Sequence, residues 1–406
     1  MNRPLFKKIQ GNLEKQLQRI ENIAEKKGEE IEKKNYEKYK YLYDICLKFL
    51  KKYDVLLYGG SAINELLPKK AKFYKEYELP DIDIFTYQAN TLIKDLLNHF
   101  KKEHHIELIT AKEALHENTF KVYSQGLQLL DITQISKQDF EILKKNALPT
   151  SLHLKSVNVE FLKYTIHTLS AQSYDSHRWT KVYERMLKFY EYYPPDYPCK
   201  LDLNDYYLSM PNDRYLAIHQ FIQDHKMPSF GWDIVHKYLK DDPLYKKLYQ
   251  TIHIEDPKPI QYVFYEGPLK TIEKEIRSKL KDLHILERYK GDTFLPGYIV
   301  LGYQKEKCLY IFETKSCLSV LQFQDDLILS IHSILTIFYA MYLSGQSKDL
   351  LCIIQFLTAV LFNNLLSRKK LFNKFVLECY GKQQGIITLR RERFKRNLKN
   401  KNIFTK

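Results

Sequence analysis

Three aspartates in apolar surroundings could bind metal ions in this sequence. Asp81 and Asp83 lie in "LPDIDIF", and Asp131 lies in "LQLLDIT". Residues two apart in a strand point to the same side, so Asp81 and Asp83 are expected on one face, with Asp131 on a neighbouring strand. Clustered carboxylates repel each other unless a cation lies between them, and oxygen ligands suit magnesium or manganese. The pattern predicts a divalent metal site.

A turn with two glycines precedes these aspartates. Gly59, Gly60 and Ser61 follow an apolar run in "VLLYGGSAINELL", although the chain has only 13 glycines in 406 residues. Glycines let the backbone approach a ligand, and Ser61 is expected to cap the following helix, whose first amides could hold a triphosphate. A phosphate clamp opposite three carboxylates indicates two-metal phosphoryl or nucleotidyl transfer.

Each signal alone also has an ordinary explanation. A Gly-Gly pair is usually a turn, an Asp-x-Asp pair is usually a loop and also occurs in sugar transferases, and a single Asp131 could cap a helix. The catalytic interpretation depends on their order along the chain: strand, Gly-Gly-Ser, helix, Asp-x-Asp within apolar strand residues, then a further strand aspartate.

The elements around these residues predict a small α/β domain over residues 53–150. Strands are expected at "VLLYGG" and "DIDIFTY", helices at "SAINELL" and "NTLIKDLLNHFKK", and a hairpin at "FKVYSQGLQLLDIT" that turns at Gln125 and Gly126.

The rest of the chain divides into regions of different pattern. Residues 1–52 predict one or two amphipathic helices with a break near Gly28, residues 151–255 a helical central region, and residues 390–406 a basic, frayed tail. Residues 256–389 predict a second α/β domain that ends in two apolar helices, 327–343 and 350–366. Polar residues interrupt both, so buried helices are expected and no membrane association.

Charge and cysteine content indicate partner and environment. The net charge of +15 predicts a polyanionic partner such as nucleic acid. The six cysteines lie far apart without a C-x-x-C pair, so buried thiols in a reducing compartment are expected, and neither a zinc site nor disulfides.

These motifs together resemble those of a known family. A G-[GS]-S turn followed by D-x-D on a strand is the signature of the polymerase-beta-like nucleotidyltransferase superfamily. Within it, "LYGGSAIN", "LPDIDIF" and "LLDIT" resemble the poly(A) polymerase catalytic subunits of nucleocytoplasmic large DNA viruses: poxviruses, asfarviruses and giant viruses. The tight match covers residues 54–135, and a looser one continues through "HRWTKVYERM".

The resemblance implies roles for the motif residues. Asp81, Asp83 and Asp131 would be the catalytic ligands of Mg²⁺ or Mn²⁺, and Gly59, Gly60 and Ser61 would hold the ATP phosphates. Family members also pair the catalytic domain with a degenerate nucleotidyltransferase-like domain, which residues 256–389 fit, since they lack both motifs and hold Glu313 as a lone carboxylate.

The expected function is template-independent addition of AMP from ATP to the 3′ end of viral mRNA. Asp131 with a metal would activate the 3′ hydroxyl, Asp81 and Asp83 would bridge both metals, and pyrophosphate would leave toward Gly60 and Ser61. Adenine preference comes only from the resemblance.

Further expectations concern binding residues, partners and location. Arg178 and Lys181 are candidates for ATP binding on the basic helix "SHRWTKVYERMLKFY", which could hold the triphosphate or the RNA backbone; an ordinary exposed helix face is an equal alternative. Expected partners are an RNA 3′ end and ATP, with a homodimer or a processivity subunit left open. The expected location is the viral factory in the host cytoplasm, and the virion is a second option.

Two other functions stay open from the sequence. One is another nucleotidyltransferase of the superfamily, of uridylyl, oligoadenylate or small-molecule type. The other is an inactive RNA-binding or processivity scaffold of the same fold, against which the intact motif residues argue.

Overall fold

The computed structural model describes residues 3–197, 199, 201–314, 316–346, 349–382 and 385–404. The chain forms two compact units. The first comprises Met1–Gln134, Leu148–Ser156 and Arg393–Lys406, and the second comprises Ile135–Ala147 and Val157–Glu392. The five-part division expected from the sequence stays a prediction.

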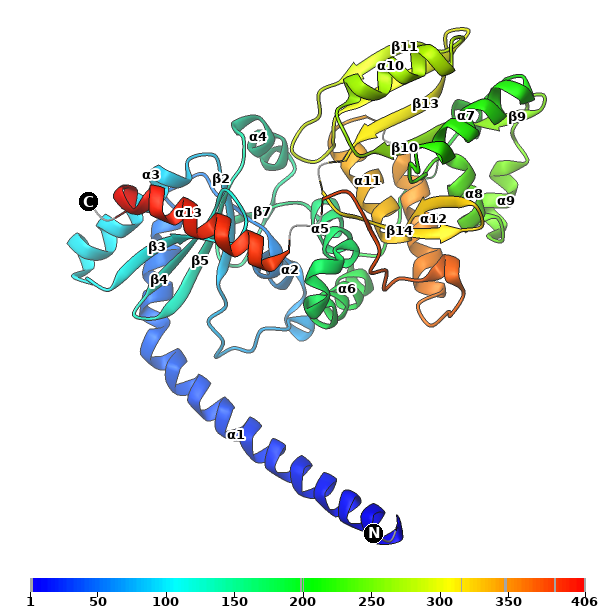
Figure 1. Ribbon diagram of the computed structural model, residues 1–406. Helices are drawn as coiled ribbons and strands as arrows, with labels where there is room; N and C mark the ends of the chain where they lie inside the picture. Colours follow the sequence, from blue (N-terminus) through cyan, green and yellow to red (C-terminus); the bar gives the residue numbers. More distant parts are fainter. Residues whose placement is uncertain are drawn as a thin grey trace. The chain divides into compact units, whose positions relative to one another are not determined.

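The first unit is a mixed sheet with helices. Its sheet has the strand order β3-β4-β5-β2-β1-β7-β6, in which β2 runs parallel to β5 and β1 parallel to β7 while the other neighbours are antiparallel. The elements are α1 (Arg3–Leu50), β1 (Leu56–Leu57), α2 (Gly59–Leu66), β2 (Ile82–Thr86), α3 (Ala89–Asn98), β3 (Ile109–Glu113), β4 (Thr119–Ser124), β5 (Leu127–Gln134), β6 (Leu148–Pro149), β7 (Lys155–Ser156) and α13 (Ile386–Phe404) (Figure 1). Only the part of α13 from Arg393 onward belongs to the first unit.

Apolar and polar side chains alternate along the central strands, so this sheet has one apolar face and one polar face. On β4, Phe120 and Val122 are buried, whereas Lys121 and Tyr123 on the opposite face are half-buried. On β2, Ile82 and Ile84 are fully buried, and Asp83 between them lies on the polar face. The period of two that predicted these strands therefore also decides which side chains remain available for chemistry.

Two expectations for the first unit were wrong. The helix α1 continues through Gly28 without a break, because the cost of one glycine, about 1 kcal/mol, is small beside the propensity of the flanking lysines and glutamates. The helix α2 begins at Gly59, with Tyr58 at the N-cap, so Ser61 lies inside the first turn and is not the cap.

The C-terminal segment also differs from its expectation. Residues up to Phe404 are helical in α13, where a frayed tail was expected. The reason is a set of contacts with the edge strand β3: Asn397 accepts a hydrogen bond from the amide of Glu113 (3.1 Å), and the Arg396 guanidinium donates to the Glu113 carboxylate (2.8 Å). An edge strand has unpaired backbone groups, and this helix satisfies one of them.

In its described residues, the second unit combines three small sheets with a helical core. Its sheets have the orders β10-β13-β12-β11, β15-β14-β16 and β8-β9. The helices are α4 (Lys137–Lys145), α5 (Val159–Ala171), α6 (Trp179–Tyr192), α7 (Asn212–Asp224), α8 (Trp232–Leu239), α9 (Pro243–Tyr249), α10 (Leu269–Lys279), α11 (Ile331–Leu343) and α12 (Leu350–Asn363), and the strands are β8 (Tyr207–Ser209), β9 (Pro257–Pro259), β10 (Gln261–Tyr265), β11 (His284–Tyr289), β12 (Tyr298–Tyr303), β13 (Glu306–Glu313), β14 (Leu318–Phe323), β15 (Asp326–Leu329) and β16 (Cys379–Tyr380).

The two apolar helices near the C-terminus are buried, as predicted. α11 packs against α5 and α12, and most of its side chains are inaccessible to solvent. Among the described residues, no helix combines the length and the apolar character that crossing a membrane requires.

The second unit repeats part of the topology of the first. The succession β10-α10-β11-β12-β13 has the same order and directions as β2-α3-β3-β4-β5: the first strand pairs in parallel with the last, and the last three form an antiparallel meander. The strand β10 therefore corresponds to the strand that carries Asp83, but its sequence "QYVFY" holds no carboxylate. Glu313 lies on β13, opposite Tyr265.

The cysteines correct another expectation. Cys199 is bonded to Cys352 and Cys317 to Cys379, all within the second unit, whereas Cys46 and Cys308 are buried free thiols. The paired residues are 153 and 62 positions apart in sequence, so spacing alone could not reveal that folding brings their Cα atoms within 4.8 and 5.5 Å.

Candidate active site

The three predicted aspartates meet on the polar face of the first unit's sheet. The parallel pairing of β2 and β5 places Asp83 directly opposite Asp131, and Asp81 immediately precedes β2. Each of the three offers a carboxylate oxygen within 4.8 Å of the others. All three side chains are half-buried, and this set of oxygen donors fits a hard divalent cation such as Mg²⁺ or Mn²⁺.

The glycine turn lies directly against Asp83. Gly59 has φ +64°, a left-handed conformation that favours glycine, and a Cβ on it would lie 2.6 Å from Asp83 Oδ2. The Gly60 amide donates to the same oxygen at 3.1 Å, and the Tyr58 amide donates to the Asp83 carbonyl at 3.0 Å. The turn therefore fixes the position of Asp83.

Ser61 makes a similar contact with the first aspartate. Its hydroxyl donates to the Asp81 carbonyl at 2.7 Å, and the side chain is only 4% exposed. In this arrangement Gly60 and Ser61 both contact the aspartate segment, so their expected contact with ATP phosphates stays a prediction.

Tyr58 packs beside the turn. Its ring stacks on Phe85 at 3.8 Å between centroids, and its hydroxyl hydrogen-bonds Thr133 on β5 at 2.8 Å. Burial, followed by the charge of Asp83, raises the pKa of Tyr58, so the phenol stays protonated. Tyr58 thus joins the end of β1 to β5, beside the aspartates.

Two further polar residues contact the aspartates, and sequence reasoning missed both. Lys121 on β4 forms an ion pair with Asp131 at 2.8 Å, and the Gln128 amide donates to Asp81 at 2.7 Å and to Asp131 at 2.8 Å. Tyr123 donates to Gln128 Oε1 at 3.1 Å, which turns the amide nitrogen toward the carboxylates. These donors supply positive charge and hydrogen bonds to the same oxygens that a cation would bind.

A bulge explains why Gln128 could not be found by pattern. Lys121 pairs with Asp131, and Val122 with Leu130, but Tyr123 then pairs with Gln128, so Leu129 is the extra residue. Without the bulge, residues three apart would lie on opposite faces of the sheet. Lys121 has a usable signal, since it is the polar residue between buried Phe120 and Val122 on the strand next to Asp131.

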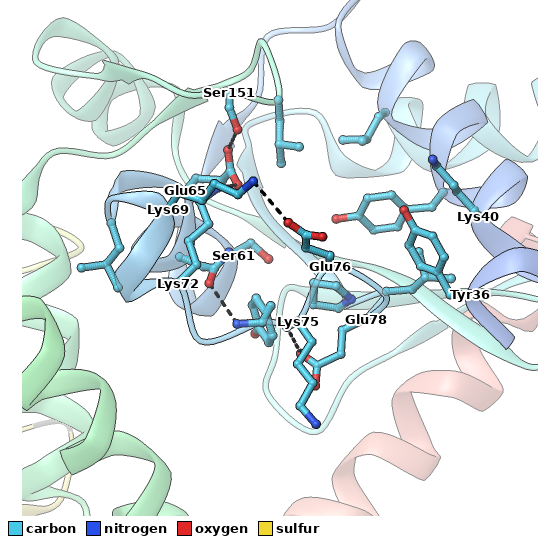
Figure 2. A pocket seen from close by; sticks show the side chains of 18 of the residues that line it. Tyr36, Lys40, Ser61, Glu65, Lys69, Lys72, Lys75, Glu76, Glu78 and Ser151 are labelled. Atoms are coloured by element: carbon cyan, nitrogen blue, oxygen red, sulfur yellow. Dashed lines mark hydrogen bonds and ion pairs between the residues drawn. The ribbon is translucent and has the colours of Figure 1, made fainter. Parts of the chain in front are cut away.

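A hollow of about 780 Å³ opens beside Ser61, between α1, α2 and the segment that leads to Asp81 (Figure 2). Its lysines face glutamates: Lys72 pairs with Glu65 at 2.7 Å, and Lys69 with Glu76 at 3.3 Å. With four basic and four acidic side chains, it is balanced in charge; these are Lys40, Lys69, Lys72, Lys75, Asp44, Glu65, Glu76 and Glu78.

The two predicted basic residues belong to the second unit. Arg178 ends a short 3-10 segment, where its guanidinium lies 3.7 Å from Asp175, and Lys181 lies in the first turn of α6. Both side chains are exposed. The aspartates belong to the first unit, so ATP binding by Arg178 and Lys181 stays a prediction.

Part of the chain is similar to a known protein family. Residues 44–176 match the family model described as "Poly(A) polymerase catalytic subunit". The chain resembles viral poly(A) polymerase catalytic subunits. A protein of Acanthamoeba polyphaga mimivirus that is named as such a subunit is 26% identical over an alignment of 197 residues, and the alignment covers 45% of this chain. The match spans about a third (32%) of that relative's length.

A solved structure confirms the fold. The Megavirus polyadenylate synthase superposes with a TM-score of 0.70 and 17% identity, covering 90% of this chain and 78% of that one. The expected fold class, a mixed α/β chain of the nucleotidyltransferase type, is therefore confirmed, as is the expected resemblance to poly(A) polymerase catalytic subunits of giant viruses.

Proposed function

We propose that this protein is a poly(A) polymerase that transfers AMP from ATP to the 3′ end of RNA. The observation that carries the proposal is the set of three carboxylates within 4.8 Å of one another, which lies inside the segment that matches the catalytic-subunit family. A divalent ion held by these oxygens would lower the pKa of an attacking hydroxyl and neutralise charge on the leaving pyrophosphate.

The protein's own residues would position the reactants. Asp83 is fixed by the glycine turn, and Asp131 by its register opposite Asp83, so neither carboxylate has to be ordered when the substrates bind. The backbone amides at the start of α2 would orient the triphosphate, since the N-terminus of a helix attracts anions. Asp131, on the side of the trio toward β4, would face the 3′ hydroxyl of the acceptor.

Primer extension tests the proposal. Purified protein is incubated with a short RNA, magnesium or manganese, and each nucleoside triphosphate separately, beside Asp81→Ala/Asp83→Ala. The matched control is Glu76→Ala/Glu78→Ala, which removes two carboxylates at the same spacing from the neighbouring charge-balanced hollow. We expect tails from ATP with the wild type and the control, and none with the aspartate variant.

The other outcomes decide between the remaining functions. Extension from UTP instead of ATP would keep nucleotidyl transfer and replace the substrate. RNA binding without extension by any nucleotide would contradict the enzyme and support the scaffold.

A further inference from the structure

The polar face of the sheet continues past the aspartates as a basic strip. Cross-strand register places Asp83 opposite Asp131, Asp131 opposite Lys121, and Lys121 opposite Lys112. These four residues therefore form one row across β2, β5, β4 and β3. Neighbouring strands are about 4.8 Å apart, so the Lys112 backbone lies two strand spacings, about 10 Å, from that of Asp131.

A hollow of about 690 Å³ covers the far end of this row. Its lining comes from α1 (Lys38, Tyr39), from the strands β3 and β4 (Lys112, Lys121, Tyr123) and from α13 (Arg393). Lys121 lines the hollow and also forms an ion pair with Asp131, so the hollow begins where the aspartate cluster ends.

The charge of this hollow distinguishes it from the one beside Ser61. Among the described residues that line it, four are basic and one, Glu113, is acidic; Glu113 is buried and bonded to Arg396 at 2.8 Å. The hollow in Figure 2 has equal numbers of acidic and basic side chains. A polyanion would therefore be attracted to the hollow lined by α1, β3, β4 and α13, and not to the hollow beside Ser61.

The walls of the hollow are fixed by contacts within the first unit. Arg393 and Asn397 lie one helical turn apart on α13, and Asn397 is held by the Glu113 amide. On the opposite side, Gln125 donates to the hydroxyl of Tyr41 on α1 at 2.9 Å. Tyr39 and Tyr123 are half-buried and line the same space, so the hollow combines aromatic and cationic side chains.

We propose that this groove, formed by α1, β3, β4 and α13, binds the single-stranded RNA next to its 3′ end; this rests on the proposed function for the identity of the acceptor. Lys112, Arg393 and Lys38 neutralise phosphates, and Tyr39 stacks on a base. Cationic grooves with aromatic platforms bind single strands without reading their sequence. From this groove, the RNA strand would follow the row of paired residues across the sheet, over Lys121, to Asp131.

RNA binding without nucleotide tests the groove independently of catalysis. Anisotropy of a short fluorescein-labelled single-stranded RNA is measured from about 50 to 200 mM salt. For Lys112→Gln/Arg393→Gln, loss of two phosphate contacts should weaken binding about tenfold and reduce the slope of log K against log salt by about 1.4. Lys40→Gln/Lys69→Gln, which removes the same charge from the charge-balanced hollow, should bind like the wild type.

A tyrosine pair on α1 tests stacking in the same way. Tyr39→Leu should lose on the order of tenfold in RNA affinity with an unchanged salt slope. Tyr36→Leu, one turn earlier and lining the other hollow, should not.

The outcomes separate this inference from the proposed function. Unchanged RNA affinity and salt slope in Lys112→Gln/Arg393→Gln would overturn the groove even if the wild type extends primers. A raised KM for ATP with unchanged RNA affinity would also overturn it and make the hollow a nucleotide site. Selective loss of RNA binding would support the groove even if no primer were extended, in which case only the proposed function fails.

Discussion

Gly59 and Asp83 are in such close contact that a side chain at position 59 would displace the carboxylate. A Cβ there would lie 2.6 Å from Asp83 Oδ2 and 3.0 Å from its Cγ. Glycine is therefore required at position 59 for two reasons: its φ is +64°, and Asp83 occupies the space that a side chain would need.

Gly59→Ala should abolish most of the activity. The left-handed backbone would cost about 1–2 kcal/mol of unfolding free energy, and the new methyl group would move Asp83 away from Asp131. We expect primer extension to fall by about a hundredfold, the order given for displacing a catalytic group by about 1 Å. Gly345→Ala is the control, since Gly345 also has positive φ (+74°) but no atom lies within 4 Å of a Cβ placed on it. Equal activity losses in both variants would contradict the proposed contact.

Lys121→Met should strengthen metal binding. The ammonium group lies 2.8 Å from Asp131 and competes with a cation for its oxygens, so its removal leaves more negative charge at the cluster. We expect the Kd for Mn²⁺, measured by calorimetry, to fall severalfold. Lys112→Met, one strand further from the aspartates, should change it much less. A weaker Mn²⁺ affinity in Lys121→Met would show that Lys121 organises the cluster and does not compete with the metal.

A buried histidine pair makes the second unit sensitive to acid. His167 and His332 are joined through their Nδ1 atoms at 2.9 Å, and their Nε2 atoms bond Tyr190 and Tyr183 respectively, both at 2.7 Å. Burial lowers the pKa of His332 to about 3 and that of His167 well below its ordinary value.

The unfolding free energy should therefore fall in acid. Unfolded histidine has a pKa of about 6.5, so below that pH the unfolded chain binds protons that the folded chain does not. The contribution of His332 to the unfolding free energy is complete above about pH 6.5 and decreases as the pH falls toward 3, by up to about 1.4 kcal/mol per pH unit. His167 acts in the same direction, because its pKa is also lowered by burial. Both tryptophans, Trp179 and Trp232, lie in the second unit, so their fluorescence during urea unfolding reports this unit.

A substitution of His332 tests whether the histidine pair causes the loss of stability in acid. His332→Gln should be less stable at about pH 7.5 but show a shallower decline toward about pH 5.5, because one titrating group is gone. His253→Gln, at an exposed position, should follow the wild type. An unchanged pH dependence in His332→Gln would rule out the pair as the acid-sensitive element.

The disulfides give a direct chemical prediction. In denatured, unreduced protein, alkylation followed by peptide mapping should label Cys46 and Cys308 and leave the other four cysteines unlabelled. Reduction should lower the unfolding free energy of the second unit by about 2–4 kcal/mol per bond. Labelling of all six would restore the expectation of free thiols, which is what a reducing compartment would favour.

The sequence alone was enough to find the residues at the centre of the candidate site. Asp81, Asp83 and the Gly-Gly-Ser turn are local patterns, because strand periodicity places both aspartates on one face and glycine permits the tight turn. Asp131 was also predictable, as a carboxylate within an apolar strand. The buried apolar helices α11 and α12 followed from composition in the same way.

Only the tertiary structure decided what surrounds that centre. Gln128 reaches the aspartates through a bulge, Lys121 through cross-strand register, and the disulfides through contacts between distant segments. The groove needs residues from α1, β3, β4 and α13, which are separated by up to 355 positions (Lys38 to Arg393). Local propensity carries no information about which distant segments meet, because those contacts are set by packing of the whole unit.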